Sequence, residues 1–236
     1  MELDELILDK GAVLARHEFF RELPAGVIGR LASRARLIGY MPGAQIFRKG
    51  DDGLGLLAVI SGLVKISVPS DDGKEIVLRL VSRNEIFGEI ALLDGGPRTA
   101  DATAVTKSQL LSLDRRDFVP LLEDEPPLAI RLLTLVSHRL RQTSEQVEDM
   151  TFADPQKRLA KALLRLAEVQ GGPPSETPRI AITQKELGRT IGLSRESTNK
   201  WLRDWEVAGH ISLEKGACTI RDRGFLTALA DGGGAS

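Results

Sequence analysis

Short stretches of alternating apolar and polar residues dominate the chain between residues 36 and 114. The stretch VKISV at 64–68 is representative, because its apolar side chains would all fall on one face of an extended strand. Turn-forming groups, among them PGA at 42, SG at 61, SDDG at 70 and DGGP at 94, separate these stretches. Short strands punctuated in this way predict an antiparallel β-sandwich or barrel.

The pattern becomes helical from Pro126 to about Met150. One set of positions in this segment recurs at alternating intervals of four and three residues, as in a heptad seam: Ala129, Leu133, Val136, Leu140, Thr143, Val147 and Met150. The seam favours a helix that pairs with a second copy of itself, and a helix packed on its own domain is the alternative. A polar residue such as Thr143 at a seam position points to control of the pairing register or to contact with a ligand.

Further helices flank this segment. Residues 1–34 look helical in two pieces separated near Pro24. After the break FADP at 152–155, Asp154 is a suitable N-cap and Pro155 a suitable first residue for a helix over 155–170. A loop, GGPPSETP, is expected at 171–178, and the final DGGGAS is expected to fray.

The segment TQKELGRTIGLSRESTNKWLRDWE at 183–206 has the pattern of a helix-turn-helix. Thr183 and Glu186 form a capping box that starts the first helix, Gly192 supplies a tight turn, and Ser194 caps the second helix. Trp201, Leu202 and Trp205 would pack the second helix inward. The preceding stretch RIAI reads as a short strand, and the following HISLEKGACTI reads as a two-stranded wing.

The first turn of the second helix would then face outward with Arg195, Glu196, Ser197, Asn199 and Lys200. A recognition helix presents such residues to base edges in the major groove, where arginine suits guanine and glutamate accepts from cytosine. A solvated pair of amphipathic helices is the alternative. The order of helix, glycine turn, capped helix and wing favours DNA binding.

Composition and charge refine this picture modestly. Hydrophobic residues make up 42% of the 236 residues and charged residues 28%, which is ordinary for a soluble globular protein. The formal net charge of −1 divides into −5 for residues 1–154 and +4 for residues 155–236, which hints at an anionic partner for the C-terminal part. Because Cys218 is the only cysteine, no intrachain disulfide or cysteine metal cluster is possible.

The stretch GEIALLDGGPRTA at 88–100 carries the main candidate chemistry of the predicted β-region. It places Glu89, Arg98 and Thr99 beside apolar residues. A guanidinium in a partly dry site suits a singly charged phosphate, and a nearby carboxylate is a good acceptor for a hydroxyl group. A structural ion pair between Glu89 and Arg98 that closes a loop is the alternative.

Three of these stretches resemble the cyclic-AMP receptor protein (CRP/FNR) superfamily of bacterial transcription regulators. They are ITQKELGRTIGLSRES at 182–197, TSEQV at 143–147 and GEIALLDGGPRTA, and the GKE turn at 73–75 is also similar. The resemblance extends from about residue 20 to residue 222. It implies an α+β fold with an N-terminal β-roll (jelly-roll) cyclic-nucleotide-binding domain at 1–125, a dimerisation helix at 126–152 and a C-terminal winged helix-turn-helix domain at 153–236.

The resemblance also implies roles for individual residues. Glu89 would accept a hydrogen bond from the ribose 2′-hydroxyl, and Arg98 would pair with the cyclic phosphate. Thr143 of the same subunit and Ser144 of the partner subunit would meet the purine. The implied ligand-binding residues are Val81, with Leu78 beside it on an apolar wall, and Gly88, Glu89, Ile90, Ala91, Arg98, Thr99, Thr143 and Ser144. The implied DNA-binding residues are Thr183, Gln184, Ser194, Arg195, Glu196, Ser197, Asn199 and Lys200.

Three positions depart from the family pattern. Thr99 stands where cAMP-binding relatives often have serine, and its hydroxyl can also accept from the 2-amino group of guanine, so cGMP stays open beside cAMP. Lys200 stands where the best-known relatives have arginine, and lysine lacks the two-pronged contact with a base. Thr198 stands where an apolar residue is usual, and its hydroxyl needs a partner if it is buried.

The resemblance therefore implies a homodimeric transcription regulator, not an enzyme, in which cAMP or cGMP controls binding to palindromic operator DNA. RNA polymerase is an expected further partner, and no cofactor or metal is expected. A CRP/FNR-type regulator with a different effector, or with none, is the alternative. A cupin-like enzyme is disfavoured because His17, His138 and His210 all lie outside the β-region. With no signal pattern and no apolar stretch near ~18 residues, we expect a cytoplasmic protein without a membrane partner.

Overall fold

The computed structural model describes residues 9–70, 75–170 and 177–232. The expected SDDG and GKE turns, most of the expected loop at 171–178, the first eight residues and the end of the C-terminal tail lie wholly or partly outside these ranges. The chain divides into two compact units. The first comprises Met1–Ile66 and Val81–Leu140, and the second comprises Ser67–Leu80 and Arg141–Ser236.

The first unit contains most of a β-roll made of two four-stranded sheets. One sheet has the strand order β1-β8-β3-β6 and the other has the order β2-β7-β4-β5. Neighbouring strands of the first sheet are antiparallel, with Leu37 opposite Leu111 and Leu57 opposite Ser112. The predicted antiparallel sandwich is thus confirmed. The strands are β1 (Arg36–Tyr40), β2 (Gln45–Phe47), β3 (Gly55–Ser61), β4 (Val64–Pro69), β5 (Glu75–Val81), β6 (Ile86–Phe87), β7 (Asp101–Ala104) and β8 (Ser108–Asp114).

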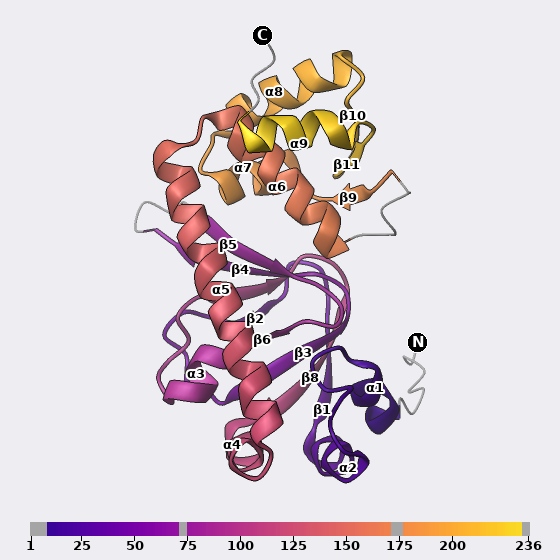
Figure 1. The fold of residues 1–236 in the computed structure, drawn as a ribbon, viewed down its shortest axis with the longest axis vertical. Helices are drawn as coiled ribbons and strands as arrows, with labels where there is room; N and C mark the ends of the chain where they lie inside the picture. Colours follow the sequence, from indigo (N-terminus) through magenta and orange to yellow (C-terminus); the bar gives the residue numbers. More distant parts are fainter. Residues whose placement is uncertain (1–8, 71–74, 171–176, 233–236) are drawn as a thin grey trace. The chain divides into compact units, whose positions relative to one another are not determined.

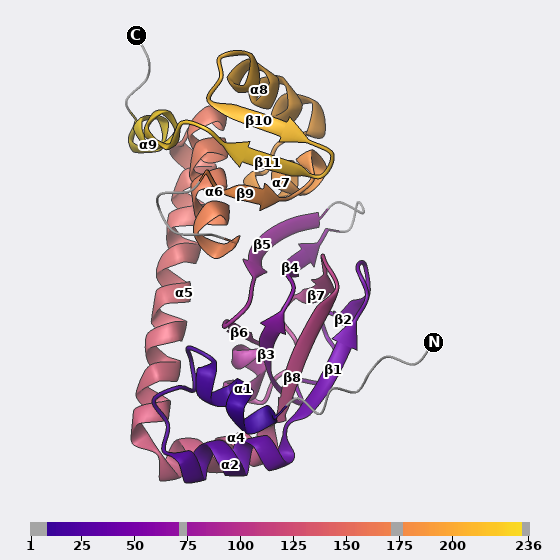
Figure 2. The same ribbon diagram turned by 90° about the vertical axis from the view of Figure 1, so that its right-hand side faces the viewer.

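Helices cover one end of this β-roll. The two predicted N-terminal helices are confirmed as α1 (Lys10–Arg16) and α2 (Ala25–Arg34), and α2 contacts both α1 and α4 (Arg115–Asp124) at the end of the β-roll seen in Figures 1 and 2. The short helix α3 (Glu89–Asp94) occupies the stretch that the strand pattern left without an assigned element. Because Gly88 and Gly95 on either side of α3 both have a left-handed backbone, the helix is limited to six residues.

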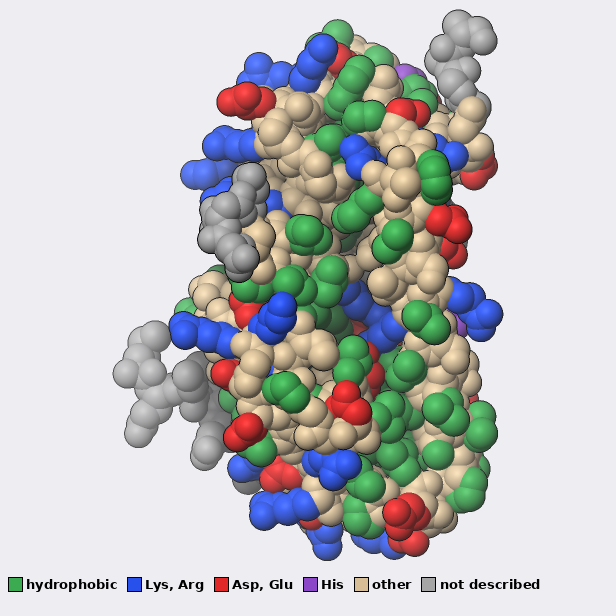
Figure 3. Space-filling view, turned by 90° about the vertical axis from the view of Figure 1, so that its left-hand side faces the viewer, with side chains coloured by type: hydrophobic (Ala, Val, Ile, Leu, Met, Phe, Trp, Pro, Cys, Tyr) green, Lys and Arg blue, Asp and Glu red, His purple; other side chains and the backbone are tan. Residues whose placement is uncertain are grey.

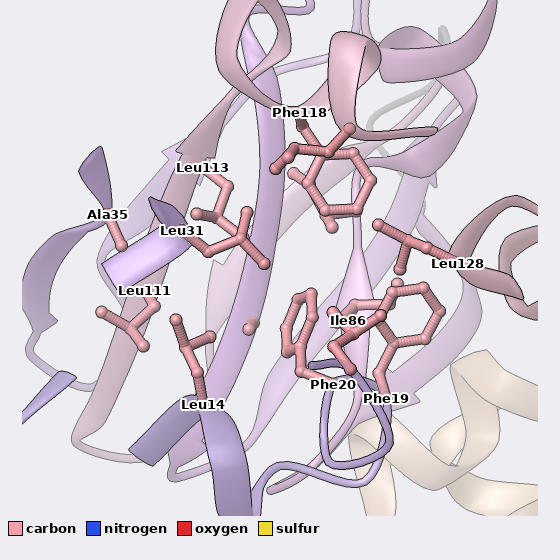
Figure 4. Close-up of a cluster of buried hydrophobic side chains, with 14 of the residues drawn as sticks. Leu14, Phe19, Phe20, Leu31, Ala35, Ile86, Leu111, Leu113, Phe118 and Leu128 are labelled. Atoms are coloured by element: carbon pink, nitrogen blue, oxygen red, sulfur yellow. The ribbon is translucent and has the colours of Figure 1, made fainter. Parts of the chain in front are cut away.

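The larger core of the first unit lies between these helices and the β1-β8-β3-β6 sheet. Phe20 and Phe118 are fully buried there, and their ring centroids are 6.4 Å apart in an edge-on arrangement. Figure 4 shows Leu128 directed toward the same cluster from the first turn of the long helix that follows α4. Leu128 and Leu132 therefore bury one face of that helix against its own domain.

His17 is an unusual member of this core. Its ring is 1% exposed and packs on Phe20, with 5.2 Å between the ring centroids. The backbone N–H of Phe19 donates to Nδ1 at 3.3 Å, while Nε2 has no described partner. Burial lowers the pKa of His17 from 6.5 to about 4, although a backbone contact and the charge of Glu85 act in the opposite direction. The neutral ring is therefore the form that the folded core accommodates.

We expect His17 to make the protein less stable in mild acid. The unfolded chain takes up a proton at His17 near pH 6.5 and the folded chain only near pH 4, so stability is full above pH 6.5 and falls between these values. The loss amounts to roughly 3 kcal/mol of unfolding free energy. Urea unfolding of wild type and His17→Gln from pH 4 to 7 should show a shallower decline in the variant. His138→Gln, which changes an exposed histidine, should retain the wild-type decline.

The predicted helix at 126–150 is confirmed as α5 (Pro126–Phe152), one continuous helix in Figures 1 and 2. Several residues of the predicted seam are more than half exposed, namely Leu133, Leu140 and Val147, and Ile130 and Phe152 are also exposed. Figure 3 shows hydrophobic side chains exposed on the face of the molecule along which α5 runs. The helix thus has one face that packs on its own domain and a second apolar face that is exposed. Among the described residues, no helix is long and apolar enough to cross a membrane.

The second unit contains the predicted helix-turn-helix. Asp154 caps α6 by accepting from the backbone N–H groups of Gln156 and Lys157, both at 2.9 Å, as predicted. The predicted wing is confirmed, but it belongs to a larger sheet of order β10-β11-β9. The sequence pattern did not indicate α9, whose N-cap Asp222 accepts from Phe225 at 2.9 Å. The elements are α6 (Pro155–Gln170), β9 (Arg179–Ala181), α7 (Gln184–Ile191), α8 (Arg195–Val207), β10 (Ile211–Glu214), β11 (Ala217–Ile220) and α9 (Arg223–Asp231).

The core of this unit joins α6, α8, α9 and the small sheet. Trp205 and Phe225 pack edge to face with 5.7 Å between their ring centroids. Leu226 and Ala230 of α9 complete the same cluster. Cys218 lies in it at 2% exposure, and burial raises the pKa of its thiol to about 12. The thiol is therefore protonated and shielded, which makes it a small core residue and not a nucleophile.

Candidate functional site

Arg98 is held by its backbone in the loop between α3 and β7. Its N–H donates to the carbonyl of Asp51 and its own carbonyl accepts from the N–H of Gly50, both at 2.8 Å. The side chain is 7% exposed, and Nη1 donates to the carbonyl of Gly88 at 3.1 Å. No ion pair to Arg98 is found among the residues that the structure describes, and its Nε is buried without a partner. A buried guanidinium therefore has unused donors for an anion.

Gly88 makes this position of Arg98 possible. Its backbone is left-handed with φ of +85°, and a Cβ atom here would lie 2.4 Å from Nη1 of Arg98. Any other residue would therefore be strained and would displace the guanidinium. Burial lowers the pKa of Arg98 from its ordinary value, while the charges of Glu89 and Asp51 act to raise it. Even so, an arginine remains charged at neutral pH.

Glu89, the first residue of α3, is buried at 6% exposure and forms an ion pair with Arg139 of α5. Arg139 also donates to the carbonyl of Ile86, the first residue of β6. The alternative of a structural ion pair between Glu89 and Arg98 is therefore wrong, because Glu89 pairs with Arg139 instead. The charges of Glu89 and Arg139 largely cancel, so the positive charge of Arg98 is not offset by an ion pair in the described structure, although the charge of Asp51 also acts on it.

The other predicted ligand residues are placed differently. Val81 is fully buried in a small apolar cluster with Phe87, and Ala91 is 2% exposed. Ile90 and Thr99 are both exposed. Within the first unit the structure thus brings Gly88, Glu89 and Arg98 together. Leu78, Thr143 and Ser144 belong to the second unit, and the last two are exposed on α5.

Sequence reasoning missed Arg139. A signal for it exists, because Leu128, Leu132, Leu135 and Arg139 are spaced by four, three and four residues on one helix face. The first three pack on the β-roll, so a charged residue that continues this face needs a buried partner. Glu89 is that partner. No cluster of three or more potential metal ligands occurs in the described ranges.

The helix-turn-helix has the predicted local structure. The hydroxyl of Thr183 accepts from the N–H of Glu186 at 3.2 Å, and the Glu186 carboxylate accepts from the N–H of Thr183 at 3.1 Å. Gly192 is left-handed with φ of +68° between the two helices. Ser194 caps α8 by accepting from the N–H of Ser197 at 3.1 Å. The capping box, the glycine turn and the N-cap are therefore all confirmed.

The outer face of α8 carries the predicted recognition residues. Arg195, Glu196, Ser197 and Lys200 are exposed, Asn199 is half-buried, and Leu202 and Trp205 are buried. Trp201 is only half-buried, and the centroid of the Trp201 ring lies 5.3 Å from Nζ of Lys200. The hydroxyls of Thr183, Ser194 and Ser197 are engaged in the caps, while Gln184 is half-buried at the start of α7. Among the predicted recognition residues, Arg195, Glu196 and Lys200 are thus the long exposed side chains.

Thr198 has the partner that its burial requires. It is fully buried, and its hydroxyl donates to the backbone carbonyl of Ser194 at 2.9 Å. It also faces Gly188 of α7, where an added Cβ would lie 2.8 Å from the threonine oxygen. The two helices therefore cross closely at a glycine and a short hydroxyl side chain.

Comparison with known proteins identifies a domain in each part of the chain. Residues 37–125 match the model of the cyclic nucleotide-binding domain, and residues 157–229 match that of the Crp-like helix-turn-helix domain. A CRP-like cAMP-activated global transcriptional regulator from Mycobacterium tuberculosis is 34% identical over 212 residues, which cover 89% of this chain and 95% of the relative. A cyclic AMP receptor protein from Thermus thermophilus is 34% identical and covers 82% of this chain and 87% of the relative.

A solved structure supports the same assignment. A transcriptional regulator of the CRP/FNR family from Thermus thermophilus superposes with a TM-score of 0.71 at 26% identity, over 84% of this chain and 100% of that chain. The Mycobacterium relative is named as a transcriptional regulator, and transcriptional regulators are not enzymes. The chain belongs to the CRP/FNR superfamily and is a DNA-binding, CRP-like transcription regulator with a cyclic nucleotide-binding domain and a helix-turn-helix domain.

Proposed function

We propose that this regulator is a homodimer that binds cAMP in its β-roll and, in response, binds a palindromic operator through α8. The Mycobacterium and Thermus relatives are named for cAMP, which supports this effector. cGMP is the alternative, because the exposed Thr99 offers a hydroxyl to a guanine 2-amino group. A different effector, or none, is the second alternative, and the titration and DNA selection given below test it as well.

The buried guanidinium of Arg98 is the observation that carries the proposal. It has no carboxylate partner among the described residues, and the neighbouring carboxylate of Glu89 is paired with Arg139. A cyclic phosphate carries one negative charge and would compensate Arg98 one to one. A nucleoside monophosphate with a dianionic phosphate would be matched less well. The charge of the site thus favours a cyclic over an open nucleotide.

The ribose and the purine complete the proposed contacts. Glu89 would accept a hydrogen bond from the 2′-hydroxyl while it remains paired with Arg139. Thr143 stands four residues after Arg139 and therefore on the same face of α5, one turn further along the helix. It is proposed to contact the purine together with Ser144 of the partner subunit. Through Glu89, Arg139 would connect the ligand to the helix that carries the exposed seam.

The exposed seam of α5 is the proposed dimer interface. Pairing of two such helices would bury Leu133, Leu140, Val147 and Met150. A dimer would place two α8 helices in successive major grooves about 34 Å apart, which requires a palindromic site. The nucleotide must bind the DNA-competent arrangement more tightly than the other, because equal affinity would shift no population.

Calorimetric titration of the full chain with cAMP, cGMP and 5′-AMP tests the effector. We expect saturable binding of a cyclic nucleotide and much weaker binding of 5′-AMP. Duplexes selected from a random pool, with and without the preferred nucleotide, then test the response. A palindromic sequence that is bound equally well in the presence and absence of both cyclic nucleotides would rule out the proposed effector while leaving the DNA-binding role intact.

Arg195→Ala should relax the sequence preference at one base pair of each half-site. An arginine that contacts guanine contributes ~1–3 kcal/mol of discrimination, so the variant should accept other bases there almost as well. The same selection of duplexes with Arg203→Ala supplies the control. Arg203 is exposed on the same helix, about two turns further along than Arg195. A uniform loss of affinity for all sequences would identify Arg195 as a phosphate contact instead.

A further inference from the structure

The guanidinium of Arg98 lies over an aromatic ring that the proposed function does not use. The Cζ atom of Arg98 is 4.3 Å from the ring centroid of Phe47, the last residue of β2. The ring is half-buried, and its centroid is 5.8 Å from that of Phe87. Phe47 packs against the apolar cluster that contains Phe87 and Val81. The ring is therefore fixed from one side by this core while its other contact is a cation.

The turn that follows Phe47 binds the backbone of Arg98. Gly50 donates to the Arg98 carbonyl and Asp51 accepts from the Arg98 N–H, both at 2.8 Å. The turn is itself closed by the carboxylate of Asp51, which accepts from the N–H of Arg48 at 2.7 Å. Aromatic ring, turn and arginine thus form one assembly, in which the main chain and the side chain of Arg98 are both held by residues 47–51.

A buried cation requires compensation when no ligand is present. An ion pair with a carboxylate would supply it, but the carboxylate would also neutralise the charge and compete with a phosphate. The face of an aromatic ring attracts a guanidinium through its quadrupole and leaves the net charge unchanged. Because the contact is made with the face of the ring and is not a hydrogen bond, it uses none of the N–H donors of the guanidinium, which stay available to a phosphate oxygen.

We propose that Phe47 is a positioning residue for Arg98, holding the guanidinium over its ring at the place where it meets the phosphate of the nucleotide. The inference rests on the proposed function, because it assigns Phe47 a role in the same site. The role is distinct from that of Gly88, which provides space, and from that of Arg139, which holds Glu89.

The test compares Phe47→Leu, Phe47→Tyr and the wild type in the full chain. Titration with cAMP and cGMP should show roughly 3- to 30-fold weaker binding in Phe47→Leu and an affinity within about twofold of wild type in Phe47→Tyr, since tyrosine retains the ring face. In a ¹H–¹⁵N spectrum, the Nε–Hε signal of Arg98, assigned by its loss in Arg98→Lys, should lose its ring-current shift in Phe47→Leu and keep it in Phe47→Tyr.

Phe118→Leu is the matched control for a purely structural effect. It makes the same truncation in the larger core of the same unit, where Phe118 is fully buried and has no described contact with Arg98. It should lower the thermal unfolding midpoint but leave the Arg98 signal and the nucleotide affinity near wild type. Equal weakening by Phe47→Leu and Phe118→Leu, or an unchanged affinity in Phe47→Leu, would overturn the positioning role. A wild type that binds neither nucleotide would instead overturn the proposed function.

Discussion

Arg98→Ala should weaken cyclic-nucleotide binding by about 100-fold or more, corresponding to roughly 3 kcal/mol. The ligand phosphate would enter a buried site with its only charge partner removed, and a charged group that loses its hydrogen bonds on burial incurs the full desolvation cost. Titration calorimetry with cAMP and cGMP measures the loss. Operator binding that depends on the nucleotide should disappear at concentrations that saturate the wild type.

The stability of the ligand-free variant separates binding from folding. Arg98 is a buried charge without an ion pair in the described structure. Its removal abolishes the free-energy cost of burying that charge, but the contact with Phe47 is lost as well. We therefore expect little change in the unfolding midpoint without ligand. Arg98→Lys keeps the charge but not the planar donors and should fall between wild type and alanine. Arg83→Ala, which removes an exposed arginine from the same unit, should bind like wild type; a similar loss there would argue against a specific role for Arg98.

Leu140→Glu should convert the proposed dimer to a monomer at concentrations where the wild type is paired. Leu140 is 67% exposed on α5 at a seam position, so pairing would bury two copies of it. Losing two buried leucines weakens association by ~3–6 kcal/mol, and burying the new carboxylates adds to this. Sedimentation equilibrium measures the dissociation constant, which we expect to rise by at least about 100-fold. Affinity for a palindromic operator should fall as dimerisation weakens, because the two half-sites would be bound independently.

Gln142→Glu is the matched control for this variant. It introduces the same carboxylate two residues away, at an exposed position outside the seam. It should remain dimeric and bind the operator as the wild type does, apart from a small effect of charge on DNA affinity. If Leu140→Glu kept the wild-type dissociation constant, the seam would not be the dimer interface.

Elements with strong local signals could be predicted from the sequence. The helix-turn-helix has a capping box at Thr183, a left-handed glycine at 192 and an N-cap at Ser194, and each of these acts within a few residues. Some strands of the β-roll follow a period of two, as β7 does, whereas β3 is buried at five successive positions. Helix α5 shows two periodicities at once, since Leu128 and Leu132 mark the packed face and Leu133 and Leu140 mark the exposed one.

Features that depend on distant contacts could not be predicted in this way. The sequence of α9 shows no clear heptad seam of apolar residues. The helix is held by the packing of Leu226 and Ala230 on α6 and by the Asp222 cap. The Glu89–Arg139 pair joins residues fifty positions apart, and the contact of Phe47 with Arg98 joins the end of β2 to the loop between α3 and β7. For this reason the sequence pointed to Glu89 and Arg98 themselves but not to the residues that hold them.

The burial of Cys218 gives the molecule a built-in reporter of motion. A thiol with a pKa of about 12 and almost no exposed surface cannot react with an alkylating reagent while β11 stays in place. As the chain contains no other cysteine, every labelled molecule must have opened around this strand at least once. The rate of labelling therefore measures how often the DNA-binding unit opens, with no probe added to the recognition helix. Measured with and without nucleotide or operator, that rate reports how far each ligand holds the unit closed.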